Sequence, residues 1–383
     1  MVMEVISSLF TFLMLWSLLS AQSLPLPVAL KVGINYGQIA NNLPTPAQVA
    51  GLLQSISISR VKLYDADPKV LAAFGNSDVE FIVSVRNEDI AAVTDPSRAQ
   101  AWLQQNVQPY LPQTRITCIT IGNEVLAGND TALASNLLPA MQSMHQALQA
   151  LGMSAAVTVT TAHSLAVLGS SYPPSSGSFR PDLAPHLQPM LDFLSRTGSP
   201  FLINAYPYFA YKGSPDTVPL PYVLFESNPG VTDPNTNLSY DNMLYAQIDS
   251  VYAAIQAMGH SDVAVRISET GWPSRGDPDE PGATPQNAAA YNRNLLQRIA
   301  TSQGTPMRPA VPIDVYVFAL FNEDLKPGPT SERNYGLFYP DGTPVYNVGL
   351  QRSLVPEYTA SSSKLEAAAT SCSFLILALV LLI

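Results

Sequence analysis

Two glutamates stand at the ends of apolar segments that have the same layout. Glu269 follows residues 263–268, a run rich in β-branched side chains, and precedes a Thr-Gly-Trp-Pro sequence. Glu124 follows residues 116–123, which end in Gly and Asn. Because Gly and Pro interrupt strands, we expect both carboxylates at the C-terminal ends of buried strands. Two carboxylates facing one pocket are what glycoside hydrolysis needs, since one protonates the leaving oxygen and the other attacks or stabilises the anomeric carbon.

Each glutamate alone also fits a structural role, as the partner of an arginine at the rim of a sheet. Two strands of matching pattern that both end in a carboxylate favour the chemical role. Trp272 fits a core position as well as a platform under a sugar ring. His163 fits a structural hydrogen bond better than a catalytic role. These segments show no Ser-His-Asp order and no phosphate-binding loop.

The other expected strand ends carry amides, phenols and further charged groups. They are Asn35 and Tyr36, Tyr64 and Asp65, Arg86 and Asn87, Asn123, Thr161 and His163, Asn204, Tyr206 and Tyr208, and Phe321, Asn322 and Glu323. Amide and carboxylate groups hydrogen-bond to sugar hydroxyls, and aromatic rings pack on the apolar faces of pyranoses. The substrate contacts expected from this ring of side chains are Tyr36, Tyr64, Asn123, Asn204, Tyr206 and Trp272.

The elements that must position these side chains alternate along the chain. Strands are expected at 32–36, 60–64, 80–85, 116–122, 155–161, 201–205, 263–268 and 314–321. Helices are expected at 45–55, 67–74, 95–110, 131–151, 183–197, 240–258 and 285–301, with a short helix or turn near 345–350. Eight such units predict a single-domain α/β fold, a (β/α)8 TIM barrel over residues 31–350, whose chemistry lies at the C-terminal strand ends. An open doubly wound sheet is the alternative, weakened because no Gly-rich phosphate turn follows the first strand.

Composition narrows the class of ligand. The chain has 383 residues, is 47% hydrophobic and carries a formal net charge of −10, which argues against nucleic-acid binding. Its two cysteines, Cys118 in an expected strand and Cys372 near the end, make no disulfide framework. The four histidines are scattered and no Cys/His cluster has ligand spacing, so we expect no metal and no other cofactor.

Both ends of the sequence carry processing patterns. Residues 1–23 contain a short apolar run followed by small residues, which predicts a cleaved secretory signal peptide. Residues 351–363 form a polar linker with a lipid-anchor site at Ser361, and residues 364–383 form a spacer with an apolar end. That end is too short for a bilayer span of about 20 residues, so it predicts a removed glycosylphosphatidylinositol signal. A plain hydrophobic terminus is the alternative.

Secretion would make two sequons usable for N-glycosylation, at Asn129 and Asn237. We expect a monomer that meets the membrane only through its lipid anchor.

Five motifs together identify a family. They are Gly33-Ile-Asn-Tyr-Gly37, Ile121-Gly-Asn-Glu124, Asn204-Ala-Tyr-Pro-Tyr-Phe209, Ser268-Glu-Thr-Gly-Trp-Pro273 and Phe321-Asn-Glu-Asp-Leu-Lys326. The chain resembles glycoside hydrolase family 17, the plant endo-β-1,3-glucanases, over about residues 31–350. The resemblance implies a (β/α)8 barrel that cleaves β-1,3-glucan with retention, with Glu269 as nucleophile and Glu124 as acid/base.

The resemblance also implies that Glu323, Lys326 and Glu332 line the site. With its anchor signal, the chain is similar to the lipid-anchored plant members, which act on callose at the cell surface. The resemblance therefore implies a location at the outer face of the plasma membrane and in the cell wall. Two alternatives stay open: a mixed-linkage β-1,3-1,4-glucanase, and a wall protein that binds glucan without cleaving it. The presence of both acids argues against the second.

Overall fold

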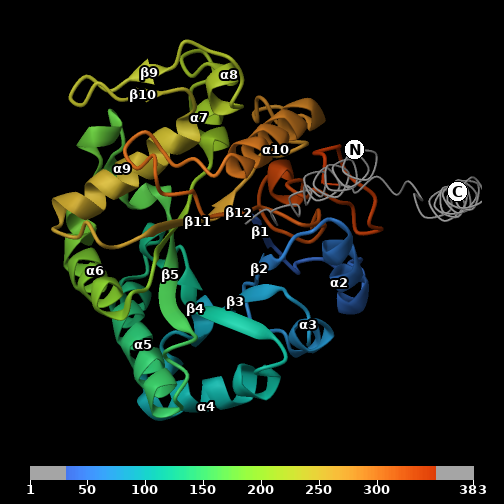
Figure 1. Cartoon of the computed structure of the whole chain (residues 1–383), viewed down its shortest axis with the longest axis vertical. Coiled ribbons are helices and arrows are strands. Elements are labelled where there is room, and N and C mark those ends of the chain that lie inside the picture. The colour runs from blue at the N-terminus through green and yellow to red at the C-terminus, as the bar shows by residue number, and fades with distance from the viewer. Residues whose placement is uncertain (1–31, 351–383) are drawn as a thin grey trace, which may run out of the picture. The chain divides into compact units, whose positions relative to one another are not determined.

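The computed structural model describes residues 32–350 and contains eight parallel strands closed into a barrel (Figure 1). Around the ring the strands follow the order β1, β12, β11, β8, β5, β4, β3, β2. Their bounds are β1 (Val32–Asn35), β2 (Arg60–Lys62), β3 (Glu80–Val85), β4 (Arg115–Asn123), β5 (Thr158–Ser164), β8 (Phe201–Asn204), β11 (Val265–Thr270) and β12 (Val315–Val317). The expected (β/α)8 barrel is confirmed.

Helices lie outside the ring of strands, as Figure 1 shows. The longer ones are α2 (Pro46–Ser55), α4 (Pro96–Asn106), α5 (Thr131–Ala150), α6 (Ala184–Thr197), α9 (Met243–Ala257) and α10 (Pro285–Ala300), and α3 (Pro68–Ala73) is shorter. The expected helix starts are confirmed at Thr45 and Asp95, whose side chains accept hydrogen bonds from backbone N–H groups of the first turn. A proline follows each of these caps, at the position where its missing N–H is harmless.

The strands are apolar because they are covered on both sides. Strand β1 and strand β8 are buried along their whole length, with helices outside and side chains filling the interior. Inside the barrel Ile82, Cys118 and Tyr316 form one buried cluster, so Cys118 serves as a small core side chain. A Cβ atom on Gly33 would lie only 2.2 Å from the Tyr316 ring, and glycine alone leaves room for that ring.

The segment after β12 differs from the expectation. The eighth strand was expected at 314–321, but regular pairing ends at Val317 because the next residues bond elsewhere. The N–H of Ala319 bonds to the carbonyl of Tyr335, and Phe321 forms an isolated bridge with Phe338, so both contact the segment that follows β12. The expected helix or turn near 345–350 is not a helix. Positive φ angles at Gly342 and Gly349 break any helical run there, and the described chain has only the short turn η8 (Thr330–Arg333) after β12.

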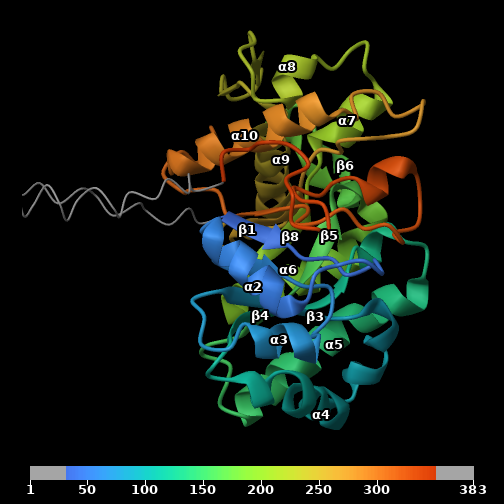
Figure 2. The same ribbon diagram turned by 90° about the vertical axis from the view of Figure 1, so that its right-hand side faces the viewer.

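Additional short elements decorate the barrel. The long loop after β8 contains α7 (Pro207–Gly213) and α8 (Leu220–Val223), and two small hairpins lie outside the barrel sheet. Figure 2 shows the blue segment after β1 and the red segment after β12 extending to the same side of the barrel. That side is the C-terminal end of the strands, and it is where these loops enclose a cavity.

Several predictions concern residues outside the described range. The signal peptide at 1–23, the linker at 351–363, the anchor site at Ser361 and the removed segment at 364–383 are all among them. Within residues 32–350, no helix has both the length and the apolar character to cross a membrane.

Candidate active site

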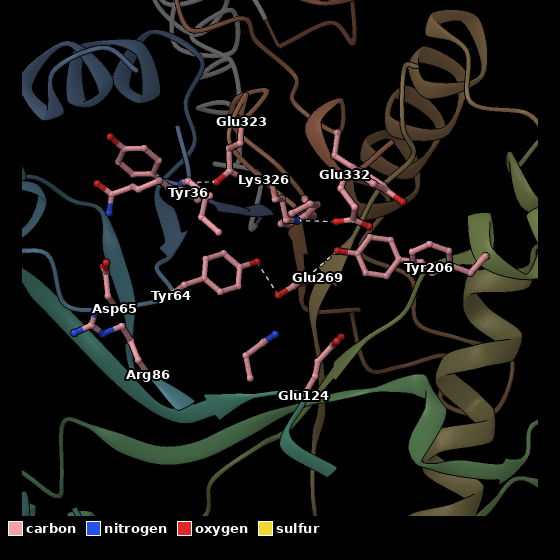
Figure 3. Close-up of a pocket in the computed structure, with 17 residues that line it drawn as sticks. Tyr36, Tyr64, Asp65, Arg86, Glu124, Tyr206, Glu269, Glu323, Lys326 and Glu332 are labelled. Carbon is pink, nitrogen blue, oxygen red and sulfur yellow. Dashed lines mark hydrogen bonds and ion pairs between the residues drawn. The ribbon is translucent and has the colours of Figure 1, made fainter. Parts of the chain in front are cut away.

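A cavity of about 580 Å³ lies at the C-terminal ends of the strands. Most of the site residues predicted from the sequence line this cavity. They are Tyr36, Tyr64, Asn123, Glu124, Tyr206, Glu269, Glu323, Lys326 and Glu332. Figure 3 shows Glu269 and Glu124 on different walls, with phenol groups of Tyr64 and Tyr206 directed at Glu269. Asn204 and Trp272 are the two predicted substrate contacts that do not line this cavity.

Glu269 is a buried carboxylate surrounded by donors. The ammonium of Lys62 and the hydroxyl of Tyr64 each lie 2.7 Å from its Oε1 atom. The hydroxyl of Tyr206 donates to its Oε2 atom at 2.8 Å. Burial by itself would raise the pKa of Glu269, but the charge of Lys62 and these three hydrogen bonds outweigh it and lower the pKa. Glu269 is therefore held as an anion.

Glu124 has the opposite electrostatic environment. Burial raises the pKa of its carboxyl, and the negative charge of Glu269 raises it further, while a 2.9 Å hydrogen bond from Asn204 only partly offsets them. Of these two acids, Glu124 is thus the one that keeps its proton at a pH where Glu269 is ionised. One carboxylic acid and one carboxylate in a single cavity are the proton donor and the nucleophile that glycoside hydrolysis uses.

The backbone before Glu124 explains the Gly-Asn-Glu sequence. Glu124 itself has φ 56° and ψ 28°, in the left-handed region that costs a non-glycine residue about 1–3 kcal/mol. The turn is fixed by a 2.8 Å hydrogen bond from its N–H to the carbonyl of Ala162. Gly122 also has a positive φ, and a Cβ there would meet Asn87 at 2.7 Å. The turn points the carboxyl of Glu124 into the cavity rather than along the strand.

A chain of amides connects the two acids. Asn123 accepts hydrogen bonds at 3.4 Å from Lys62, the partner of Glu269, and from Asn204, the partner of Glu124. The carbonyl oxygen of Asn204 accepts a 2.6 Å bond from Ser268, which precedes Glu269. Asn204 therefore lies beside the cavity and positions Glu124 through the hydrogen bond that it donates. It does not line the cavity, where a direct contact with substrate was expected.

A second group of charges lies on the segment after β12. The carboxylate of Glu323 accepts a 2.8 Å hydrogen bond from the N–H of Ile39, and burial raises its pKa. Lys326 and Glu332 form an ion pair with 3.0 Å between Nζ and Oε2 (Figure 3). The ammonium of Lys326 also lies 4.2 Å from the centre of the Phe318 ring. These groups face the same cavity as the two acids.

The expected contact between Trp272 and the substrate is wrong. Its side chain is fully buried, and its indole N–H donates a 2.8 Å hydrogen bond to the carbonyl of Gly282. Its ring packs against Tyr208 and Tyr291, at centroid distances of 5.1 and 5.6 Å. Trp272 holds the loop after β11 against the helix behind it, and it offers no face to a sugar. The aromatic residues that line the cavity are instead Tyr36, Tyr64, Tyr206, Phe209, Phe318 and Tyr335.

Lys62 is the functional residue that the sequence analysis missed. It is only 1% exposed, at the end of β2, and it alternates with Arg60 on the strand and with Tyr64 just after it. A lysine alternating with other polar residues inside an apolar strand was the available signal. The partner across the barrel could not be inferred from that pattern alone.

Other predicted residues lie where they take no part in this site. His163 is buried and stacks on Phe201 at 4.6 Å, and burial lowers its pKa to about 3, so it is a neutral core residue. The sequon residues Asn129 and Asn237 are exposed. In the part of the chain that the structure describes, no group of three or more His, Cys, Asp or Glu side chains is placed to hold a metal ion.

Comparisons with known proteins agree on one family. The model described as "Glycosyl hydrolases family 17" matches residues 32–350. Glucan endo-1,3-beta-glucosidase 14 of Arabidopsis thaliana is 64% identical over 321 residues, covering 84% of this chain and 82% of that protein. Glucan endo-1,3-beta-glucosidase 11 of the same plant is 58% identical over 320 residues, covering 83% and 75%.

Solved structures give the same picture. A beta-1,3-glucanase and allergen of Cryptomeria japonica pollen superimposes with a TM-score of 0.80 at 39% identity, covering 84% of this chain and 99% of that one. A structure from a study of two plant beta-glucan endohydrolases with distinct substrate specificities gives a TM-score of 0.77 at 36% identity, covering 82% and 99%.

Proposed function

The chain belongs to glycosyl hydrolase family 17, and from this premise we propose that it hydrolyses internal β-1,3-glucosidic bonds of β-1,3-glucan. One observation carries the proposal. Glu124 and Glu269 line a single cavity, and their surroundings move their pKa values in opposite directions. A pair of carboxyl groups tuned in this way supplies an acid and a base at the same pH.

We assign the steps as follows. Glu269 attacks the anomeric carbon, and Glu124 gives its proton to the oxygen of the departing sugar, so the glycosidic bond breaks as the Glu269 ester forms. Glu124, now ionised, takes a proton from water, and the resulting hydroxide equivalent displaces Glu269. Lys62, Tyr64 and Tyr206 hold Glu269 in its charged form before the attack and after the release.

The substrate class is tested on polymers that differ in linkage. The purified protein should release reducing ends from laminarin, a β-1,3-glucan, and should produce short oligosaccharides rather than glucose alone. Barley glucan, with mixed β-1,3 and β-1,4 bonds, should be cleaved more slowly. A Glu269→Gln variant serves as the inactive control, and binding of laminarin without release of reducing ends by the unmodified protein would favour the glucan-binding alternative.

The location of the protein is part of the same proposal. Secretion, anchoring at Ser361 and N-glycosylation at Asn129 and Asn237 are supported by their sequence patterns and by the exposure of both asparagines. Phosphatidylinositol-specific phospholipase C should release the protein from plant membranes, and peptide N-glycosidase should lower its apparent mass. Mass spectrometry that finds residues 364–383 in the mature chain would exclude the anchor. We propose a monomer, which sedimentation of the released protein tests.

A further inference from the structure

We propose that Glu280 is a positioning residue for this reaction: it fixes the turn η8 so that Lys326 and Glu332 face the substrate. The proposal rests on the proposed function, because it concerns groups that line the same cavity. Glu280 itself does not line the cavity, and it lies in the loop between β11 and α10.

The carboxylate of Glu280 is buried and is surrounded by donors. Its Oε2 atom accepts hydrogen bonds from the backbone N–H groups of Asp277, at 2.9 Å, and Ser331, at 3.0 Å. Its Oε1 atom accepts from the hydroxyl of Ser331 at 2.6 Å and from the ammonium of Lys212 at 2.8 Å. Burial opposes ionisation, but Lys212 and these hydrogen bonds prevail and lower the pKa of Glu280 to about 2. The carboxylate is therefore an acceptor at any working pH.

A neighbouring carboxylate binds the adjacent residue of the same turn. Asp277 accepts a 2.8 Å hydrogen bond from the N–H of Thr330 and a second bond from its hydroxyl. The backbone N–H of Ser274 donates to the carbonyl of Asn334 at 2.8 Å. The loop after β11 is thus hydrogen-bonded to the start of η8 at Thr330, to its middle at Ser331 and to the residue after its end, Asn334. Gly276 lets this loop fold tightly, since a Cβ there would lie 2.7 Å from the Cβ of Glu280.

The turn η8 carries Glu332, which belongs to the second group of charges that faces the cavity. Glu332 directly follows Ser331 and is paired with Lys326 at 3.0 Å. Arg333, on the same turn, donates to the carbonyls of Lys326 and Gly328 at 3.0 and 2.9 Å. The position of Lys326 therefore depends on the position of η8 through two contacts. Moving η8 would move both charges away from the sugar, while Glu269 keeps its own donors on other elements.

The test removes the acceptor and then restores it. Glu280→Ala should lower kcat/KM on laminarin at least ~10-fold, because small displacements of binding groups have large effects on rate. The loss should lie mainly in KM, since within residues 32–350 no hydrogen bond joins η8 to Glu124 or Glu269. Glu280→Gln keeps an oxygen for the two backbone N–H groups and should recover most of the loss. Asp277→Ala, at a more exposed position, should change KM in the same direction by less.

Asp233 offers a matched control. It is also a buried carboxylate that accepts from a backbone N–H and a hydroxyl of a distant loop, both from Ser175, at 2.8 and 2.9 Å. Neither it nor Ser175 lines the cavity. Asp233→Ala should therefore destabilise the fold to a similar extent and leave KM unchanged. A kcat/KM of Glu280→Ala within twofold of Asp233→Ala, or a loss that Glu280→Gln does not recover, would overturn the proposal.

Hydrogen exchange separates this proposal from the proposed function. In Glu280→Ala the amides of residues 323–335 should exchange faster than in the unmodified protein, and in Asp233→Ala they should not. Unmodified protein that fails to hydrolyse laminarin refutes the proposed function, and the exchange of this segment still decides whether Glu280 fixes it. Unchanged exchange in a folded Glu280→Ala variant refutes the positioning role even if the protein is a glucanase. Should Glu280→Ala not fold, Asp277→Ala and Ser331→Ala provide the same two readouts.

Discussion

The ammonium nitrogen of Lys62 lies 2.7 Å from Oε1 of Glu269, and the two side chains are 1% and 8% exposed. Strands β2 and β11, which carry them, are not neighbours, since β1 and β12 lie between them in the ring. The pair therefore spans the interior of the barrel at its C-terminal end. A buried carboxylate with this partner is kept ionised, which is the form that the proposed nucleophilic role of Glu269 requires.

Replacing Lys62 tests the ion pair. Lys62→Met removes the main opposing charge, so the pKa of Glu269 should rise and the acid limb of the kcat/KM profile should move to higher pH. At the original optimum kcat/KM should fall by about 10²–10³-fold, the range found when one fixed electrostatic partner of a reacting group is lost. Lys69→Met, an exposed change on α3, is the control. An acid limb that stays in place in Lys62→Met would show that another group sets it.

The hydroxyls of Tyr64 and Tyr206 should each help to keep Glu269 ionised, because both donate hydrogen bonds to its carboxylate. Hydrogen bonds to a charged group are worth about 1.5–3 kcal/mol, so Tyr64→Phe and Tyr206→Phe should each lower kcat/KM by about 10–100-fold. Tyr208→Phe is a matched control, because the hydroxyl of Tyr208 is buried and has no hydrogen-bond partner among residues 32–350. That change should leave activity unaltered and stability equal or higher. Equal losses in all three variants would point to packing rather than to hydrogen bonding with Glu269.

The pH dependence follows from the two shifts. In the proposed mechanism activity requires Glu269 ionised and Glu124 protonated, so it should rise with pH through the pKa of Glu269 and fall through the pKa of Glu124. The first lies below the ordinary glutamate value of 4.5 and the second above it. Initial rates on laminarin across pH should therefore form a bell whose two limbs fall on opposite sides of that value. Both limbs on the same side would contradict the assignment.

Glu124→Gln should separate proton donation from the rest of the reaction. The variant should lose about 10²–10⁴-fold on laminarin, the usual contribution of general acid catalysis. It should lose much less on an aryl laminarioside whose phenol leaves without a proton. Glu88→Gln, an exposed change, controls for loss of one negative charge. Equal losses on both substrates would remove Glu124 from the acid role.

The stereochemical course of the reaction depends on the distance between the carboxyl groups of the two acids. Retention requires their carboxyl groups about 5–5.5 Å apart, and inversion requires about 6.5–9.5 Å to admit a water. The resemblance to glycoside hydrolase family 17 implies retention, so proton NMR should show the β anomer as first product, and a 2-fluoro-laminarioside should label Glu269. First release of the α anomer, or a label on another residue, would refute the mechanism.

The sequence by itself determined the barrel and most of the cavity. Alternating helix and strand patterns fix the order of elements, and a parallel closed sheet then brings every C-terminal strand end to one side. Polar residues at such ends, among them Glu124 and Glu269, are thereby brought to the same region, although His163 packs into the core. Local patterns also sufficed for the helix caps at Thr45 and Asp95, because the side chain of a cap bonds to backbone groups only two or three positions away.

Only the tertiary structure decided which strand-end residues meet. Lys62 faces Glu269 because the tilt and stagger of strands set which inward positions lie at one height, and neither is written in a local pattern. Trp272 comes shortly after Glu269, the penultimate residue of β11, but its indole packs on Tyr208 and Tyr291 and not on the cavity. The hydrogen bond from Ser331 to Glu280 joins two residues that lie 51 positions apart in the chain. Each of these contacts depends on how distant segments fold against one another, and no spacing of neighbouring residues encodes it.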